Sequence, residues 1–466
     1  MYFINHLNIS LAALGAITLG SCAQDGKRAE VNPPNIIFIL ADDLGYGDLS
    51  CYGQEKFSTP NIDRLSAEGI RFTNHYSGST VSAPSRSSLL TGLHTGNTPV
   101  RGNKEYRPEG QQPLPQTTRT IAHVLKDAGY TNGIVGKWGL GYPGSGSEPL
   151  DMGFDYFFGN NCQRHAHHYF VDYLWENRQR VSYDEPVYSH DAVTDKGMQF
   201  IRDHKDKPFF LYMAYAIPHA EMVLPQEYLE PFIGKYPEPN PWPAGHSYGE
   251  QPYPRAALAA MITHLDSDVG RIMDLLAQLG IDDNTLVIFT SDNGPAVEGG
   301  NDPAFFNSSG GLRGTKRDLY EGGIRVPFVA RFPGVIPKGV ETGHISAFWD
   351  VFPTFSELAG VVTDVETDGI SLVPVFMGQA DKQPKHEYLY WEFHELGARQ
   401  AVRMDQWKGV RYNLTDGNRD IELYNLDNDP GETTNIASDY ADVVARISEI
   451  MRSARVASPE FPFPMD

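Results

Sequence analysis

The sequence has few cysteines and no excess of positive charge. Three cysteines in 466 residues are too few for a disulfide framework. The chain carries 38 Lys and Arg against 59 Asp and Glu, a formal net charge of -21 at pH 7. This balance argues against a broad basic face for DNA, RNA or anionic lipid, so we expect no nucleic-acid partner. Any anionic ligand must therefore meet a local cationic pocket.

The beginning of the chain lacks charge altogether. Residues 1–21 contain no Asp, Glu, Lys or Arg, and the apolar run 11–19 is too short to span a bilayer. The run ends in Leu-Gly-Ser-Cys at 19–22, which resembles the lipobox of bacterial lipoproteins. We expect a signal peptide at 1–21, lipidation of Cys22 and a tether at 22–34. The protein would then be exported to the periplasm or cell surface and touch membrane through its lipid anchor only. A plain secretory signal with an incidental cysteine is the alternative.

The rest of the chain alternates short apolar runs with amphipathic stretches, without internal repeats. Strands are expected at 36–40, 133–135, 209–214 and 286–289, and helices at 118–128 and 255–279. Such alternation predicts an α/β fold with a mostly parallel sheet covered by helices on both faces, which we place at 35–375.

Two further regions depart from this pattern. Seven prolines fall within 231–254, so we expect a surface loop there, whose Tyr236, Trp242 and Tyr248 either pack within the loop or stack on sugar rings. After about residue 375, closely spaced strands (388–393, 400–403, 407–412 and 422–426) precede a helix at 437–454. We therefore predict a small C-terminal antiparallel sheet with one packing helix at 376–466.

Two acidic pairs follow predicted strands. Asp42-Asp43 comes after the run 35–41, and Asp292-Asn293 after 285–291. Ligand sites in open α/β sheets lie at the carboxyl ends of strands, where residues about 250 positions apart can meet. Three carboxylates and one amide oxygen form a hard donor set that suits Ca²⁺ or Mg²⁺. A solvated turn or a helix cap is the alternative for either pair taken alone.

A third motif is Ser-Ala-Pro-Ser-Arg at 82–86, followed by Leu-Thr-Gly at 90–92. Ser82 or Ser85 before helix-forming residues predicts a capped helix start. The free N–H groups of that helix start, together with Arg86, favour an anion.

These motifs together resemble the formylglycine-dependent type I sulfatases of the alkaline-phosphatase-like superfamily. The resemblance runs in order through nearly the whole mature chain. It implies that an anaerobic sulfatase-maturating enzyme oxidises Ser82 to formylglycine (3-oxoalanine). It also implies one divalent cation, Ca²⁺ or Mg²⁺, held by modified Ser82 and the four residues Asp42, Asp43, Asp292 and Asn293.

Further matches to this family extend the site. Gly-Lys-Trp-Gly-Leu-Gly at 136–141 places Lys137 on the sulfate, and the Pro-His pair at 218–219 matches the family's strand-end histidine. Gly-Thr-Lys at 314–316 matches its second lysine block. The resemblance implies that Arg86, Lys137 and Lys316 neutralise charge on the sulfuryl group. His219 would protonate the leaving sugar oxygen.

One position departs from the family pattern. Gly139 stands where many relatives carry a histidine, and a substitute is expected in the His-rich stretch 160–168. His165 and His167 would face the same side if that stretch is extended. We expect substrate contacts from this stretch and from the first strand of the C-terminal sheet, with a metal-binding His cluster or a plain surface loop as alternatives for the stretch. The candidate substrate-binding residues are Gln163, Arg164, His165, His167, Glu392 and His394.

Export and sulfatase motifs together indicate hydrolysis of sulfate esters of carbohydrate. The serine-type signature and lipobox resemble carbohydrate sulfatases of Bacteroidetes that degrade polysaccharides. Oligosaccharides of algal glycans such as ulvan or carrageenan, or of host glycans, are the expected substrates. A phosphate or phosphonate ester hydrolase of the same superfamily and a non-catalytic glycan-binding lipoprotein are the alternatives.

Overall fold

The computed structural model describes residues 33–464. The predicted signal peptide, Cys22 and all but the last two residues of the tether lie outside the described residues. Among residues 33–464, no helix combines the length and the apolar character needed to cross a membrane.

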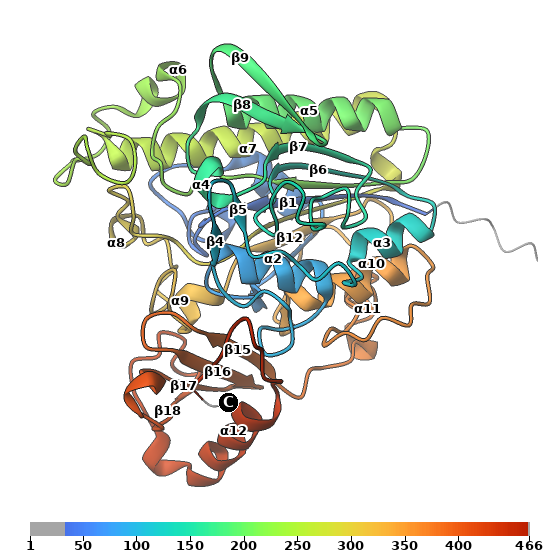
Figure 1. Cartoon of the computed structure of the whole chain (residues 1–466). Helices are drawn as coiled ribbons and strands as arrows, with labels where there is room; N and C mark the ends of the chain where they lie inside the picture. The colour runs from blue at the N-terminus through green and yellow to red at the C-terminus, as the bar shows by residue number, and fades with distance from the viewer. Residues whose placement is uncertain (1–32, 465–466) are drawn as a thin grey trace, which may run out of the picture. The chain divides into compact units, whose positions relative to one another are not determined.

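A ten-stranded mixed sheet organises the fold (Figure 1), in the order β13-β2-β12-β11-β1-β10-β6-β7-β8-β9. Its centre is parallel: β1 lies between β11 and β10, and β10 pairs with β6. Antiparallel pairs flank this centre at β11–β12 and β7–β8. The strands are β1 (Asn35–Ala41), β2 (Ile70–Phe72), β6 (Thr131–Lys137), β7 (Tyr156–Asn160), β8 (Phe170–Glu176), β9 (Gln179–Tyr188), β10 (Phe209–Ala214), β11 (Thr285–Ser291), β12 (Phe328–Arg331) and β13 (Val340–Thr342).

Helices cover both faces of the sheet, as the buried side chains of β1 show. Ile37 and Ile39 pack into one apolar core with α1, α5 and α7, whereas Ile36 and Phe38 pack into another with α2, α3 and α10. Because both faces of β1 are buried, its sequence is a continuous apolar run. These helices are α1 (Pro60–Ala67), α2 (Ser82–Thr91), α3 (Ile121–Asp127), α5 (Ser189–His204), α7 (Pro254–Leu279) and α10 (Val351–Leu358).

The C-terminal part is a four-stranded antiparallel sheet with one long helix, as predicted. The strands β15 (Leu389–Phe393), β16 (Arg399–Met404), β17 (Trp407–Arg411) and β18 (Glu422–Asn425) pair in chain order. Helix α12 (Ala441–Ser453) packs Ile447 and Met451 against one face of this sheet. The other face shares a core with Tyr76 and Trp349 of the larger part. The boundary between 375 and 376 stays a prediction.

The shorter elements shape the site. They include α4 (Gln163–Ala166), α9 (Glu321–Ile324) and a hairpin of β4 (Glu105–Tyr106) and β5 (Gly110–Gln111). The Pro-rich segment forms turns, short helical pieces and one isolated bridge between Trp242 and Gln251, consistent with the predicted loop.

Candidate functional site

The candidate site lies where β1 and β11 end. These strands are paired in register, so Asp42 and Asp43 meet Asp292 and Asn293 at one edge of the sheet. The Asp43 N–H donates to Asp292 Oδ1 at 3.2 Å, and Asn293 Nδ2 donates to Asp43 Oδ1 at 2.7 Å. Asp43 has φ 64°, a left-handed conformation that aspartate tolerates better than most residues, and this turn directs its side chain into the site. The predicted meeting of the two pairs is therefore present.

Ser82 is the first residue of α2, and its side chain faces the carboxylates. Its Oγ donates to Asp42 Oδ1 at 2.9 Å and accepts from Lys137 Nζ at 3.1 Å. The expected capping role is wrong for both serines. Val81 is the N-cap, Ser82 bonds to Asp42, and the Ser85 hydroxyl accepts from the Gly78 N–H. Asp42 draws the Ser82 hydroxyl away from the helix backbone.

Three cations complete the buried cluster. Arg86 donates to Asp292 Oδ2 from Nε and Nη2 at 3.2 and 3.0 Å. Lys137 Nζ reaches Asp42 Oδ2 at 2.5 Å, and Lys316 Nζ reaches Asp43 Oδ2 at 2.8 Å. All three cations are at most 8% exposed. The formal charges of the three carboxylates and the three cations sum to zero, so these six side chains carry no net charge.

Burial and neighbouring charges set the protonation of the carboxylates. Burial raises the pKa of Asp43 to about 6, and that of Asp292 to about 6 with the help of the Asp42 charge. Burial acts in the same direction on Asp42, but Lys137, His219 and Arg86 together hold its pKa well below the usual range. The carboxylate beside Ser82 is therefore the most firmly ionised of the three.

The residues fit a hard divalent cation. Asp42, Asp43, Asp292 and Asn293 are at most 3% exposed, and all offer oxygen. The Asn293 Oδ1 atom is buried without a hydrogen-bond partner among the described residues, as expected of an amide oxygen reserved for a cation. Side-chain atoms of Asp42, Asp43 and His219 also lie within 4.8 Å of one another. Because the oxygen set matches a hard cation better, we place His219 beside the cation site rather than in it.

His219 and His167 form a stacked pair above the carboxylates. Their ring centroids are 3.7 Å apart with an interplanar angle of 16°. His219 Nε2 lies 3.3 Å from Asp43 Oδ2, and His167 Nε2 lies 3.2 Å from Lys137 Nζ. Burial and the Lys316 charge lower the pKa of His219 to about 3, and burial lowers that of His167 well below its usual value. Both rings are therefore neutral at pH 7 when no substrate is bound.

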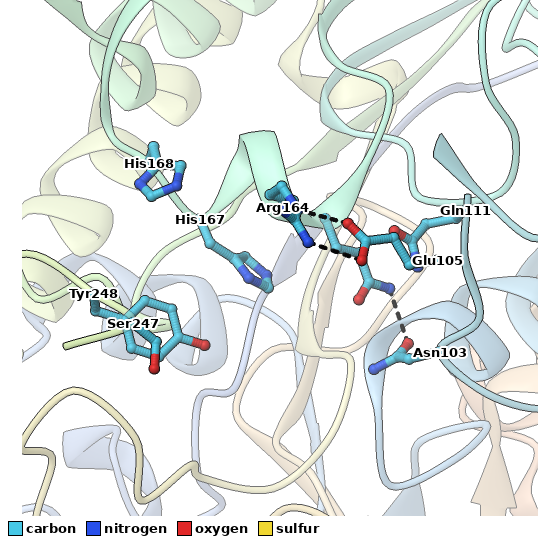
Figure 2. Close-up of a pocket in the computed structure, with 9 residues that line it drawn as sticks. Asn103, Glu105, Gln111, Arg164, His167, His168, Ser247 and Tyr248 are labelled. Carbon is cyan, nitrogen blue, oxygen red and sulfur yellow. Dashed lines mark hydrogen bonds and ion pairs between the residues drawn. The ribbon is translucent and has the colours of Figure 1, made fainter. Parts of the chain in front are cut away.

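A polar pocket of about 440 Å³ opens beside this pair. Figure 2 shows His167 and His168 on one side, Tyr248 and Ser247 on another, and the Arg164–Glu105 ion pair opposite. Arg164 donates from Nε and Nη2 to the two Glu105 oxygens at 2.6 and 2.9 Å. The full lining comprises Asn103, Glu105, Gln111, Gln163, Arg164, His167, His168, Ser247 and Tyr248. Through His167 the pocket reaches Lys137 and hence Ser82.

The structure separates two histidines that were expected to face the same way. Residues 163–166 form α4, so the stretch is not extended as His165 and His167 would require. His165 turns to the Tyr173 ring at 4.3 Å and to Glu109, with Nδ1 3.6 Å from Oε1. Only His167 of the two lines the polar pocket.

Glu392 and His394 do not line the polar pocket. Glu392 is fully buried and accepts from Arg101 at 3.1 Å and Arg455 at 2.6 Å. His394 packs against Phe461 and Phe463. Glu392 thereby joins the C-terminal sheet to the larger part through Arg101. The expected substrate contact from this strand finds no support in the geometry.

Sequence reasoning missed Asn103. Its Oδ1 accepts from the Ala83 N–H at 3.1 Å and from Gln163 Nε2 at 2.9 Å, which ties the helix carrying Ser82 to the pocket wall. No sequence motif singles out Asn103.

Tyr248 was expected either to pack within the loop or to stack on sugar rings. It lies on the pocket wall, with its ring 6.0 Å from that of His219.

Comparison with known proteins matches this chain to one family. The sulfatase family pattern matches residues 34–361, and the pattern described as N-sulphoglucosamine sulphohydrolase, C-terminal, matches residues 314–457. N-acetylgalactosamine-6-O-sulfatase of Bacteroides thetaiotaomicron is 31% identical, over 91% of this chain and 93% of that protein. Human N-acetylgalactosamine-6-sulfatase is 30% identical, over 93% of this chain and 87% of its own length.

Solved structures agree in fold. The crystal structure of Ps i-CgsB in complex with k-i-k-neocarrahexaose superposes with a TM-score of 0.78 at 28% identity, covering 91% of this chain and 93% of that one. Phosphonate monoester hydrolase of Agrobacterium radiobacter has the same fold, with a TM-score of 0.65 at 23% identity, covering 90% of this chain and 95% of that one. The chain belongs to the sulfatase family and is a sulfuric ester hydrolase.

Proposed function

We propose that the protein hydrolyses sulfate esters of oligosaccharides through Ser82 converted to formylglycine. One observation carries this proposal: the Ser82 side chain lies between Asp42 and Lys137, inside a charge-balanced buried cluster that connects to an open polar pocket. A serine with only a structural role would not need two charged partners and a route to solvent.

Each cation has a distinct position for binding sulfate. Lys137 donates a hydrogen bond to Ser82. Lys316 donates to Asp43, and Arg86 donates to Asp292. Together they present positive charge where a sulfuryl group must sit to meet Ser82. A divalent cation, Ca²⁺ or Mg²⁺, bound by Asp42, Asp43, Asp292, Asn293 and modified Ser82 would supply further positive charge to activate the nucleophile and the ester.

His219 is placed to assist the leaving group. It lies at the boundary between the buried cluster and the polar pocket, next to Tyr248. An anionic substrate beside the ring favours its protonated form, which can then give a proton to the departing sugar oxygen. His167, stacked on it and touching Lys137, takes the place of the histidine that is missing at Gly139.

The polar pocket indicates a sugar substrate. Amides, hydroxyls and an ion pair line it, which suits a ring with many hydroxyl groups. The relatives named for N-acetylgalactosamine 6-sulfate and the neighbour bound to neocarrahexaose support carbohydrate sulfates of host or algal origin.

The decisive test is maturation of Ser82. Protein co-expressed with an anaerobic sulfatase-maturating enzyme should show a loss of about 2 Da in the Ser82 peptide and should cleave an aryl sulfate faster than the matching aryl phosphate. Ser82→Cys keeps the family signature and should retain activity, whereas Ser82→Ala should have none. Serine that stays unmodified beside a matured control sulfatase would refute the proposal. Preference for the phosphate ester would instead favour the phosphohydrolase alternative.

The cation has a separate test. Dialysis against a chelator should lower both activity and the melting temperature, and either Ca²⁺ or Mg²⁺ should restore both, because a ligand bound only to the folded state stabilises it. Asn293→Ala should weaken this thermal response. A melting temperature that is indifferent to chelator and to both ions would refute the cation site.

Export as a lipoprotein is the remaining part of the proposal. Fatty-acid labelling of the full chain should require Cys22, with Cys51→Ser as the matched control, since Cys51 lies within the folded part. Labelling that persists in Cys22→Ser would refute lipidation at this position.

A further inference from the structure

A second cavity lies close to the polar pocket and shares its hairpin. It has a volume of about 520 Å³, and we call it the aromatic cavity. Its principal lining residues are Tyr106, Arg107, Glu109, Tyr142, Trp175 and Arg180. None of these residues belongs to the buried charge cluster around Ser82.

The hairpin β4–β5 separates the two cavities. Glu105 lines the polar pocket and Tyr106 lines the aromatic cavity. Consecutive residues of a strand point to opposite faces, so the two cavities lie back to back across one thin ribbon. Figure 2 shows the polar-pocket side of this ribbon, with Glu105 held by Arg164.

The aromatic cavity offers flat apolar surfaces. The Tyr106 and Tyr142 rings are stacked, with centroids 5.6 Å apart and an interplanar angle of 25°. A side chain at Gly110 would come within 2.5 Å of Tyr142 Cβ, so glycine at this position allows Tyr142 to lie against the hairpin. Trp175 is fixed by its Nε1–H, which donates to Glu109 Oε1 at 2.6 Å. Rigid aromatic faces of this kind stack on the C–H faces of sugar rings.

The same cavity has exposed positive charge. The Arg107 side chain is 74% exposed and its nearest acidic contact is 3.9 Å away, at Glu105. The Arg180 side chain is 53% exposed and lies over the Tyr173 ring while it pairs with Glu109 at 3.0 Å. Arginine binds sulfate and carboxylate groups with two parallel hydrogen bonds, and each of these side chains keeps donors accessible to solvent. In a chain of net charge -21, this pairing of arginine and aromatic rings favours an anionic sugar.

Glu109 links the aromatic cavity to the segment that carries His167 of the polar pocket. It accepts from Tyr173 at 2.9 Å and from Trp175, and it faces His165. Burial acts to raise the pKa of Glu109, but nearby His165 and the hydrogen bonds from Trp175 and Tyr173 lower it to about 2, so it stays ionised. His165 belongs to the same short segment as His167 of the polar pocket.

We propose that the aromatic cavity is a second carbohydrate site, which binds a sugar carrying a sulfate or carboxylate group at a distance from the ester that is cleaved. The inference rests on the proposed function, because it assumes a sulfated polysaccharide as the natural ligand. It narrows the substrate class to anionic oligosaccharides, since a single sugar in the polar pocket does not reach the other face of the hairpin.

The test measures binding and turnover separately. Calorimetry with the full chain would use hexasaccharides of chondroitin sulfate, heparan sulfate and ι-carrageenan. For the hexasaccharide that binds, Tyr142→Ala and the pair Arg107→Gln/Arg180→Gln should each raise Kd by about tenfold, the effect of losing about 1.4 kcal/mol. The double substitution of the arginines should also weaken the dependence of Kd on NaCl concentration.

Two controls address loss of structure. Tyr142→Phe keeps the aromatic face and should bind like the wild type, and Arg452→Gln removes an exposed arginine from α12 without effect. Melting temperatures of all variants should agree within a few degrees. Equal Kd values for Tyr142→Ala and the wild type, or no binding of any hexasaccharide, would overturn the second site.

Failure of this inference can be told from failure of the proposed function. Matured enzyme that cleaves an aryl sulfate but binds hexasaccharides equally well in every variant is a sulfatase without the second site. Matured enzyme that cleaves no sulfate ester refutes the proposed function itself.

Discussion

Two buried charge clusters in this chain look alike and serve different purposes. The cluster of the proposed active site, which we call the active-site cluster, contains Asp42, Asp43, Asp292, Arg86, Lys137 and Lys316. The second, which we call the joint cluster, contains Glu321, Lys408, Glu432 and Arg403, and it joins the C-terminal sheet to α9. In the joint cluster Lys408 Nζ lies 2.7 Å from Glu321 Oε1, and Glu432 Oε2 accepts from the Glu321 N–H at 2.7 Å.

The difference between the clusters lies in what surrounds them. The active-site cluster contacts His167, which lines an open pocket. Lys408, Glu321 and Glu432 of the joint cluster are fully buried, and no described cavity is lined by them. Burial of charge therefore does not identify an active site by itself. Access to a pocket does, whereas a buried oxygen without a hydrogen-bond partner among the described residues occurs at both clusters, at Asn293 Oδ1 and at Glu432 Oε1.

The largest effect should come from Ser82→Ala in the active-site cluster. Removal of the proposed nucleophile should lower kcat/KM for an aryl sulfate by at least about 10⁴-fold. The midpoint of urea unfolding should hardly change, because only one hydroxyl is lost. Matured Ser82→Cys is the control. A Ser82→Ala enzyme with a tenth of wild-type activity would break the distinction between the clusters.

Lys408→Met in the joint cluster should have the opposite effect. It leaves Glu321 and Glu432 buried without their lysine, which should cost about 3–5 kcal/mol in the free energy of unfolding. Urea titration measures this loss, and kcat/KM at low temperature should stay close to the wild-type value. Lys338→Met, a lysine at an exposed position, is the matched control. Stability equal to that of the wild type would show that the joint cluster does not hold the sheet in place.

His219→Gln should reveal leaving-group chemistry. For a sugar sulfate the loss of a general acid should lower kcat by about 10²–10³-fold, and for an aryl sulfate with an acidic phenol the loss should be much smaller because that leaving group needs no proton. The ratio of the two losses is the measured quantity. Equal losses on both substrates would assign His219 to binding alone.

The smallest effect concerns pH and Glu432. Burial raises the pKa of Glu432 to about 7 in the folded protein, with the neighbouring Glu321 acting in the same direction. A raised pKa means that the folded state binds the proton more tightly than the unfolded state does. The stability that this proton contributes is fully present below about pH 4.5, the ordinary glutamate value, and is lost as pH rises through about 7.

Glu432→Gln keeps an acceptor for the Glu321 N–H and removes this titration. Relative to the wild type, the variant should gain about 1–3 kcal/mol between pH 4.5 and pH 8, measured by urea unfolding at both values. The reverse sign would contradict the assignment.

The sequence predicted the centre of the fold better than its edges. The strands at 36–40 and 209–214 are apolar throughout because both of their faces are buried, and both are confirmed as β1 and β10. The hairpin of β8 and β9 was missed. It alternates buried and exposed side chains irregularly, contains a register shift between Val171 and Tyr173, and includes Pro186, so no regular period marks it.

In the site, residues that belong to sequence motifs were predicted better than residues whose positions depend on tertiary contacts. Asp42, Ser82 and Lys137 lie in motifs whose order in the chain is informative, and the structure brings their side chains together. The positions of His165 and Glu392 depend on neighbours far away in the chain, Glu109 and Arg101 among them, which no short motif records. Residues whose direction is set by tertiary packing are those for which the sequence alone was insufficient.

The hairpin β4–β5 has a consequence for engineering and for the divergence of relatives. Residues 105–111 contribute to both cavities: Glu105 and Gln111 line the polar pocket, and Tyr106, Arg107, Pro108 and Glu109 line the aromatic cavity. Insertion or deletion of one residue in β4 would turn Glu105 and Tyr106 to the opposite faces of the strand. Selectivity for the sugar that reacts and selectivity for the sugar held farther away would then change in a single step. Replacement of residues 105–111 is therefore the smallest change expected to give a new glycan preference.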